Sequence, residues 1–119
     1  GSSWITANSS YTWTTIGTST DAATPTQTLT GSSSTTTRAY IEAITSTSAI
    51  RLFGQVRLYD PAATVAKRFD WNINSDAPNN TTGFGSPNTT SAVNGVRFIN
   101  ISGGTFTSGK IYLYGVKNT

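Results

Sequence analysis

The strongest constraint on the fold is a two-residue alternation that runs from Ala49 to Tyr59. One side of this run carries Ile50, Leu52, Gly54, Val56 and Leu58, and the other side carries Arg51, Phe53, Gln55, Arg57 and Tyr59. Because successive side chains of a β-strand point to opposite faces of its sheet, this alternation predicts a strand. Gly54, in the middle of the run, indicates a bulge or the close approach of another backbone.

Further segments show the same alternation over shorter lengths. We expect one or two short strands within 4–16, a strand over 38–47 that forms a hairpin with 49–59, and a strand over 68–73. In the last of these, the alternation predicts that Trp71 and Ile73 point inward while Asp70 and Asn72 point outward.

The connections are rich in turn formers. Asp60-Pro61-Ala62-Ala63 has the Asp and Pro placement of a type I turn. The Ser/Thr-rich stretch 17–34 predicts a long surface loop or an extended edge in which only 27–30 pairs, and 31–37 is the expected flexible part. Residues 74–92 contain two prolines and two glycines, which predicts a long irregular connection of the kind that often carries function.

Composition supports an ordered all-β domain. Serine and threonine make up 38 of the 119 residues, and threonine favours strands because its branched Cβ is stiff. Thirteen aromatic residues supply the apolar area that a disordered chain lacks. We therefore predict a single domain over 1–119 that forms an antiparallel, jelly-roll-like β-sandwich of about eight short strands, with 1–3 as a tag remnant or the start of an expressed fragment.

The residue inventory argues against several kinds of chemistry. The chain has no His and no Cys, so the usual nucleophile–base pairs cannot form, and we expect neither catalytic residues nor a cofactor. Asp70–Asp76 places oxygen atoms at alternate positions as a calcium loop does, but Ser75 replaces the required glycine, so no metal is expected. The net charge of +3 comes from scattered basic residues, which does not predict nucleic-acid binding. No apolar run is long enough for membrane insertion.

Near the end of the chain, two β-rich runs, 95–101 and 109–117, flank a loop with Gly103 and Gly104 and predict an antiparallel strand pair. Read from Val93 to Lys117, this pattern resembles the closing segment of β-sandwich domains at the C-termini of bacteriophage tail fibre and minor structural proteins. The resemblance covers about 25 of the 119 residues. It implies a jelly-roll-like fold, a homotrimer, a place on the virion, and contacts with other virion proteins and the host cell surface. The matched segment is typical of scaffold, so the resemblance transfers no binding residue.

Candidate binding residues come instead from aromatic side chains that have polar neighbours. A sugar-binding surface stacks pyranose faces on aromatic rings and binds the hydroxyls with a few polar groups. The candidates are Phe84, Trp71, Trp13, Asn72, Asn79 and Asn80, with Trp4 and Tyr11 as further aromatics. Core burial is the favoured alternative for Trp71 and Trp13, whereas Phe84, which lies between glycines in an expected loop, should be exposed. Tyr112 and Tyr114 alternate with Ile111 and Leu113, so one set should face a neighbouring subunit.

Three functional hypotheses follow. The first is a phage structural domain, a tail fibre or adhesin module, that binds a host-surface glycan or protein, with contacts in the loops 17–37 and 74–92. The second is a carbohydrate-binding module of a secreted enzyme, which rests on fold and aromatics alone. The third is an architectural part of the virion, such as a head decoration or a fibre-tip trimerisation domain.

Overall fold

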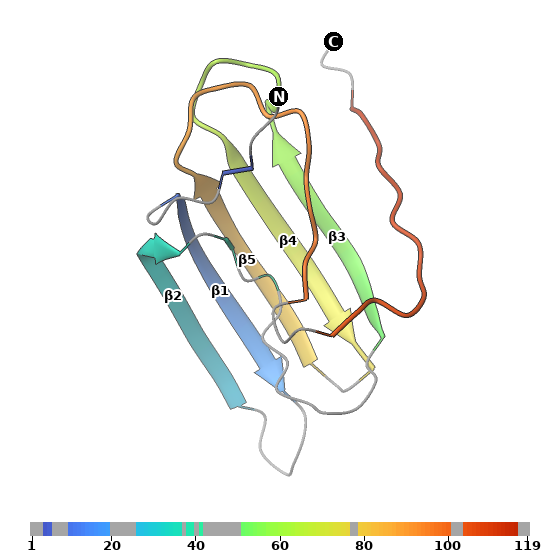
Figure 1. Ribbon diagram of the computed structural model, residues 1–119. Coiled ribbons are helices and arrows are strands. Elements are labelled where there is room, and N and C mark those ends of the chain that lie inside the picture. Colours follow the sequence, from blue (N-terminus) through green and yellow to red (C-terminus); the bar gives the residue numbers. More distant parts are fainter. Residues whose placement is uncertain are drawn as a thin grey trace.

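The protein forms one five-stranded antiparallel sheet (Figure 1). The computed structural model describes residues 4–5, 10–19, 26–36, 38–39, 41, 51–76, 79–100 and 104–116. These residues form no helix, so the prediction of an all-β antiparallel fold is confirmed. The spatial order of the strands is β2-β1-β5-β4-β3, and their bounds are β1 (Tyr11–Ser19), β2 (Thr26–Thr36), β3 (Leu52–Tyr59), β4 (Arg68–Ser75) and β5 (Asn79–Pro87).

The alternation of the strands separates an inner face from an outer face. Trp71 and Ile73 are buried on the inner face, while Asn72 is exposed on the outer one, as the sequence predicted. The core consists of Trp13, Trp71 and Ile73, and partly buried apolar side chains pack around it, namely Tyr11, Ala39, Ile41, Val56 and Phe69. The rings of Phe69 and Trp71 stack with their centroids 5.7 Å apart. The inner face therefore buries aromatic area, and the outer face carries polar side chains together with the exposed Phe84 and Ile16.

Strand β5 occupies a part of the chain for which the sequence predicted an irregular connection. It pairs with β1 on one side and with β4 on the other. The prediction for 74–92 was therefore wrong over Asn79–Pro87. Gly83 and Gly85 do not break this strand, because aromatic rings of the neighbouring strands lie directly over them. A Cβ at Gly85 would come within 2.7 Å of the Phe69 ring, and one at Gly83 would run into the Trp71 ring.

Strand β2 forms the edge of the sheet beside β1. The sequence offered a surface loop or an extended edge for 17–34, and the extended edge is the arrangement observed, although it spans Thr26–Thr36 rather than 27–30. Residues 31–37 were the expected flexible part of this stretch. Residues 31–36 belong to β2, and Gly31, Ser32, Ser33 and Thr36 pair with the first half of β1. Residue 37 lies outside the described residues.

Strand β3 and the turn after it agree with the sequence. The close backbone approach expected at Gly54 is present, since a Cβ there would lie 2.9 Å from the Ile73 Cα and would overlap the Asn72 carbonyl oxygen. The turn at 60–63 is closed by a hydrogen bond of 3.2 Å from the Ala63 amide to the Asp60 carbonyl. The fully buried Lys67 ammonium donates to the carbonyls of Ala63 and Val65, which fixes the connection between β3 and β4.

The predicted hairpin of 38–47 with 49–59 lies mostly outside the described residues. Of its first strand only Arg38, Ala39 and Ile41 are described, and they have no strand geometry. Ala39 and Ile41 nevertheless pack against the core, so this part of the chain covers the inner face.

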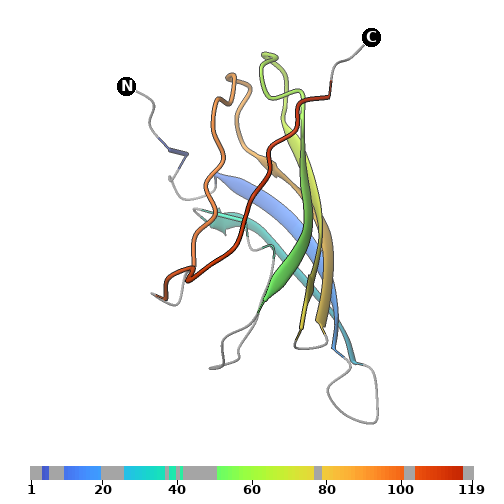
Figure 2. The same ribbon diagram turned by 90° about the vertical axis from the view of Figure 1, so that its right-hand side faces the viewer.

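The predicted C-terminal strand pair does not form within the described residues. Residues 93–100 and 104–116 lie on one side of the sheet as extended chain without strand pairing (Figures 1 and 2). The prediction was wrong because the alternation of side chains does not determine which strand will form backbone hydrogen bonds with the segment. Here each residue of 104–116 is exposed to solvent.

Candidate functional site: a polar outer face with a central aromatic ring

Strand register brings two rows of side chains together on the outer face. The first row runs Arg57, Asp70, Phe84 and Thr14 across β3, β4, β5 and β1. The second row runs Gln55, Asn72, Thr82 and Ile16 across the same strands. These eight residues line an open hollow of about 470 Å³, with Trp71 and Gly83 at its floor. We refer to them below as the outer-face site.

Phe84 is the central feature of this site. Its ring is 65% exposed, as the sequence predicted, but it projects from strand β5 rather than from a loop. The neighbours on either side, Asp70 and Thr14, are polar and shorter, so the ring stands above them. An aromatic ring held by a sheet and bordered by polar groups is a surface on which a flat, partly apolar ligand can stack.

A charged cluster borders Phe84 on the β3 side. Arg57 donates to both carboxylate oxygens of Asp70, with Nε 2.8 Å and Nη2 3.0 Å from them, and the Tyr59 hydroxyl donates to Asp70 Oδ2 at 2.6 Å. The hydrogen bond from Arg57, assisted by that from Tyr59, holds the pKa of Asp70 below its usual value. The hydrogen bond to Asp70 in turn raises the pKa of Tyr59. Asp70 is therefore a fixed acceptor at neutral pH, not a proton donor.

Amide and hydroxyl side chains of β4 and β5 extend the site along these two strands, next to Phe84. Asn80 Nδ2 lies 2.8 Å from Asn74 Oδ1, and Asn72 Nδ2 lies 3.1 Å from the Thr82 hydroxyl. Asn74 Nδ2 donates to Asn72 Oδ1 at 3.2 Å, which links the two pairs. These bonds orient each amide while leaving further donor and acceptor positions toward solvent, since an amide can form up to four hydrogen bonds.

The structure brings together only some of the binding residues expected from the sequence. Phe84, Asn72 and Asn80 share the outer face, and the side chain of Asn79 lies outside the described residues. Trp13 and Trp71 are 6% and 2% exposed and form the core, which is the alternative that the sequence favoured for both. Their burial follows from the glycines of β5, over which both tryptophans pack.

Several site residues were not singled out by the sequence as binding candidates. Arg57 and Gln55 lie on the polar side of the alternating β3 run, and Thr14 and Thr82 lie at matching positions in β1 and β5. The alternation in the sequence already placed Arg57 and Gln55 on the polar side of their strand. Only the register of β5 against its neighbours could have shown that these residues meet.

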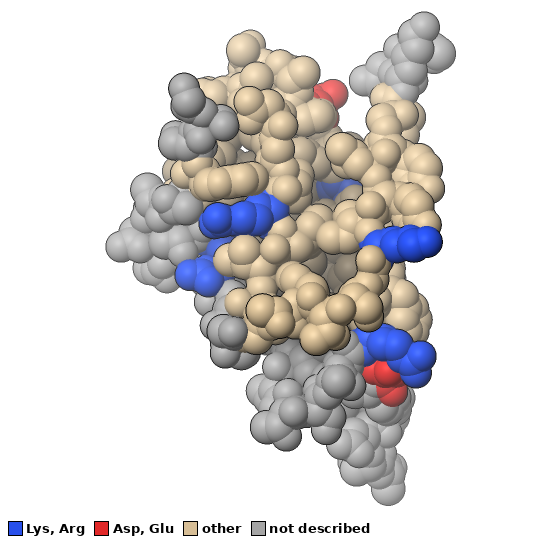
Figure 3. All heavy atoms as spheres, turned by 45° about the vertical axis from the view of Figure 1, so that its right-hand side comes forward, with Lys and Arg blue, Asp and Glu red and all other residues tan. Residues whose placement is uncertain are grey.

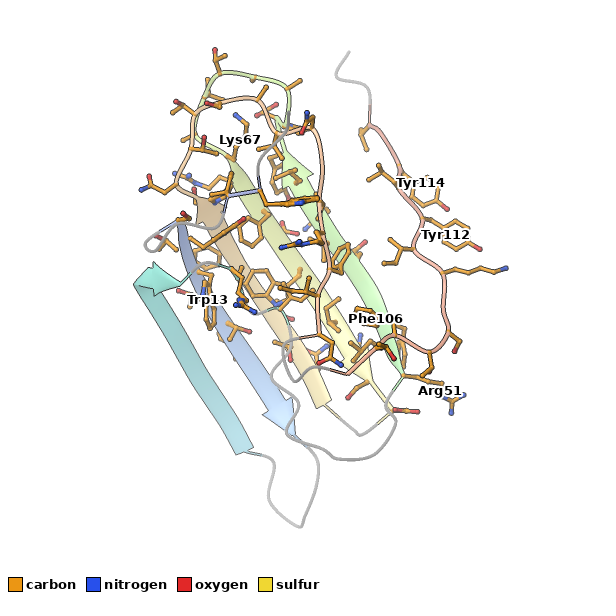
Figure 4. The ribbon with its side chains drawn as sticks, viewed as in Figure 1. Trp13, Arg51, Lys67, Phe106, Tyr112 and Tyr114 are labelled. Carbon is orange, nitrogen blue, oxygen red and sulfur yellow. The ribbon has the colours of Figure 1, made fainter. Side chains whose placement is uncertain are left out.

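Tyr112 and Tyr114, expected at an oligomer surface, do not line this site. They are 66% and 81% exposed and stack on each other with centroids 6.3 Å apart. Figure 4 shows both side chains pointing away from the sheet. The neighbouring Ile111 and Leu113 are also exposed, so the structure does not separate the two alternating sets.

The other charged groups of the described segments are dispersed. Basic side chains are spread over the surface seen in Figure 3 and do not form a stripe. Asp76 pairs with Arg51 at 2.9 Å, and this hydrogen bond lowers the pKa of Asp76. Among the residues whose placement is described, no three acidic, His or Cys side chains gather as metal ligands would, and no helix is long and apolar enough to span a membrane.

Comparisons with known proteins add no identity. No protein-family model, no curated protein and no solved structure matches this chain.

Proposed function

We propose that the chain is a non-catalytic binding module that attaches a bacteriophage tail to glycan on the host cell surface. The observation that carries the proposal is the exposed Phe84 ring, which stands with the exposed Ile16 in a hollow whose other outer-face side chains are polar. The outer-face site is rigid because each of its side chains projects from a strand of the sheet. Such a surface suits a ligand with one apolar face and many hydroxyls, and a pyranose has both.

In this proposal each part of the site has a role. Phe84 stacks on the apolar face of a sugar ring, Asn72 and Thr82 exchange hydrogen bonds with hydroxyls, and the Asp70 carboxylate accepts from them. The hollow is open, so a single site encloses little of its ligand, and affinity per site is modest. Several copies on one particle would compensate for this through multivalent attachment.

The phage assignment rests on the resemblance of Val93–Lys117 to the closing segment of tail proteins. In this proposal the complete fold is a jelly-roll-like sandwich of about eight strands. The five-stranded sheet supplies one layer, and the segments 93–100 and 104–116 belong to the second layer, on the side where Figure 2 places them.

The proposal is tested by exchanging Phe84 for Ala and measuring binding to arrays of bacterial surface glycans and to host cells. We expect Phe84→Ala to weaken binding about tenfold, because a stacked aromatic ring contributes roughly 1–3 kcal/mol. Phe106→Ala is the matched control, since Phe106 is 63% exposed but is not part of the outer-face site, and it should bind as the unchanged protein does. Equal binding by Phe84→Ala and the unchanged protein would contradict the proposal.

A second candidate function is architectural, as a head decoration or a fibre-tip trimerisation domain. The observation that favours it is the exposed apolar run Ile111–Val116. Saturable binding to capsids without binding to host cells would support this role. Binding to plant or microbial polysaccharide without binding to host cells would instead indicate the carbohydrate-binding module of a secreted enzyme.

A further inference from the structure

A second hollow lies at the end of the sheet where β4 begins and β5 ends. Its volume is about 470 Å³, and its polar lining consists of Arg68, Ser86, Asn88, Thr89 and Thr90. The β3–β4 connection and the segment after β5 lie side by side at this end (Figures 1 and 2), joined by a hydrogen bond of 2.7 Å from the Val93 amide to the Pro61 carbonyl. We refer to this hollow below as the Arg68 hollow.

The guanidinium of Arg68 is held in place on one side and is free on the other. Its Nη1 lies 2.9 Å from the Lys67 carbonyl oxygen and 2.9 Å from the Ser86 hydroxyl oxygen, and the Ser86 hydroxyl donates to the same carbonyl at 2.7 Å. Among the described residues, the three N–H groups on Nε and Nη2 have no acceptor. A fixed planar fork with free N–H groups can bind a carboxylate or a phosphate through two parallel hydrogen bonds.

The positive charge at this end of the sheet is not balanced by a nearby carboxylate. Lys67, next to Arg68 in the chain, is fully buried, and its ammonium donates to neutral backbone carbonyls. Asp70 accepts from Arg57 and Tyr59 instead, and within the described ranges no carboxylate lies at ion-pair distance from either cation. Two cations without a counter-charge, one of them removed from water, create a local potential that favours an anion.

The Arg68 hollow adjoins the outer-face site along the strands. Ser86 follows Phe84 by two residues on β5, and Arg68 precedes Asp70 by two residues on β4, so all four side chains belong to the same face of the sheet. Two residues of a strand span about 7 Å, which is close to the length of one sugar unit. A saccharide stacked on Phe84 can therefore place an acidic group against Arg68.

We propose that the Arg68 hollow binds the acidic group of a saccharide whose ring stacks on Phe84, so that the module selects acidic over neutral glycans. Nε and Nη2 of Arg68 donate to two oxygens of the acidic group, while Ser86 and the Lys67 carbonyl hold the guanidinium in position. The stacked ring rests on the proposed function, whereas the oxyanion site rests on the Arg68 hollow alone. A carboxylate and a phosphate fit the same fork, and the experiment separates them.

Nuclear magnetic resonance of the full nitrogen-15-labelled chain tests the site with three sugars. Glucuronate and glucose 6-phosphate carry the two acidic groups, and glucose is their neutral counterpart. We expect the Arg68 Nε–H signal to shift saturably with at least one acid, and that acid to bind about tenfold more tightly than glucose, because hydrogen bonds to charged groups are the stronger kind. The acid that binds more tightly identifies the preferred group. Equal binding of all three sugars, or an Arg68 signal that does not respond, would overturn the proposal.

Variants of Arg68 separate its fork from its charge. Arg68→Gln should bind the acidic sugar no better than glucose, and Arg68→Lys, which keeps the charge without the fork, should recover only part of the loss. Lys110→Gln is the matched control, because it removes the same charge from an exposed residue outside both hollows, and it should bind the acid as the unchanged protein does. An equal loss in Lys110→Gln and Arg68→Gln would show attraction by net charge and overturn the assigned site. The amide spectrum of each variant checks its fold, and the comparison of sugars on the unchanged protein depends on no variant.

The same titrations distinguish this proposal from the function on which it rests. Weaker glucose binding by Phe84→Ala, with equal binding of acids and glucose by the unchanged protein, would support stacking on Phe84 and overturn the oxyanion site. Acid binding that shifts the Arg68 signal and keeps its full affinity in Phe84→Ala would support the oxyanion site and contradict the stacking.

Discussion

At the scale of single residues, the glycines of β5 show how this sheet accommodates its aromatic core. Gly83 lies under the Trp71 ring and beside the Thr14 carbonyl, and Gly85 lies under Phe69. Aromatic side chains can pack across strand glycines and restore the contacts that the missing side chain would have made. Glycine has a low β-propensity, but at these two positions the packing of the aromatic rings requires it.

This requirement predicts a large effect for Gly83→Ala. The new methyl group would collide with a buried ring and with backbone, which no rotamer change relieves, so we expect a loss of about 3 kcal/mol in the free energy of unfolding. Gly17→Ala is the matched control in β1, because its nearest atom would be at an ordinary 3.7 Å, and it should alter stability little. Urea denaturation measures both, and similar stability of the two variants would contradict this account of β5.

At the scale of elements, the pairing of β3 with β4 includes an ion pair that should respond to acid. The folded pKa of Asp70 is lowered from the usual 3.8 by the hydrogen bond from Arg57. The fold therefore favours the charged carboxylate. Its contribution is complete above pH 3.8 and is lost as the pH falls through the lower folded pKa.

Carbon-13 NMR titration of the Asp70 carboxyl tests this coupling. We expect a midpoint below 3.8 in the unchanged protein and a midpoint shifted upward in Arg57→Gln, which removes the main donor. Arg51→Gln should raise the pKa of Asp76 and leave that of Asp70 in place, because each arginine serves one carboxylate. If Arg57→Gln left the titration midpoint of the Asp70 carboxyl unchanged, the ion pair between Arg57 and Asp70 would not be formed in solution.

The elements also show what the sequence could and could not predict. Alternation identified β3 and β4 and the inward side of Trp71, because these strands carry large apolar residues at every second position. It missed β5, whose inward positions are threonine and glycine, since the apolar area over them is supplied by Trp13, Trp71 and Phe69 of its neighbours. The outer-face site was found only in part, because it arises from the register of four strands and Arg57 and Asp70 are thirteen residues apart in the chain.

At the scale of the whole molecule, the structure contains one formed sheet, and the described C-terminal segments are extended and expose their apolar side chains on one side of it (Figure 2). The C-terminal run was expected to close the fold as a strand pair, and its side chains do have the pattern for this. The sequence pattern decides which side chains point to each face of a strand. The stability of the strand also requires a partner for its backbone hydrogen bonds and the burial of its apolar side chains. If the architectural candidate is right and the exposed run Ile111–Val116 associates with other copies of the chain, folding stability and association are linked.

That linkage predicts a thermal midpoint that depends on protein concentration. For a chain of 119 residues that unfolds from a dimer or trimer, each tenfold increase in concentration should raise the midpoint by about 3 °C. Differential scanning fluorimetry over a hundredfold range measures the shift, and Leu113→Asp should abolish it by removing the contact without touching the core. Phe84→Ala should keep the full shift, because Phe84 lies on β5 and not in the run Ile111–Val116. A midpoint independent of concentration in the unchanged protein would mean that the sheet and the C-terminal segment reach their stable state within one chain.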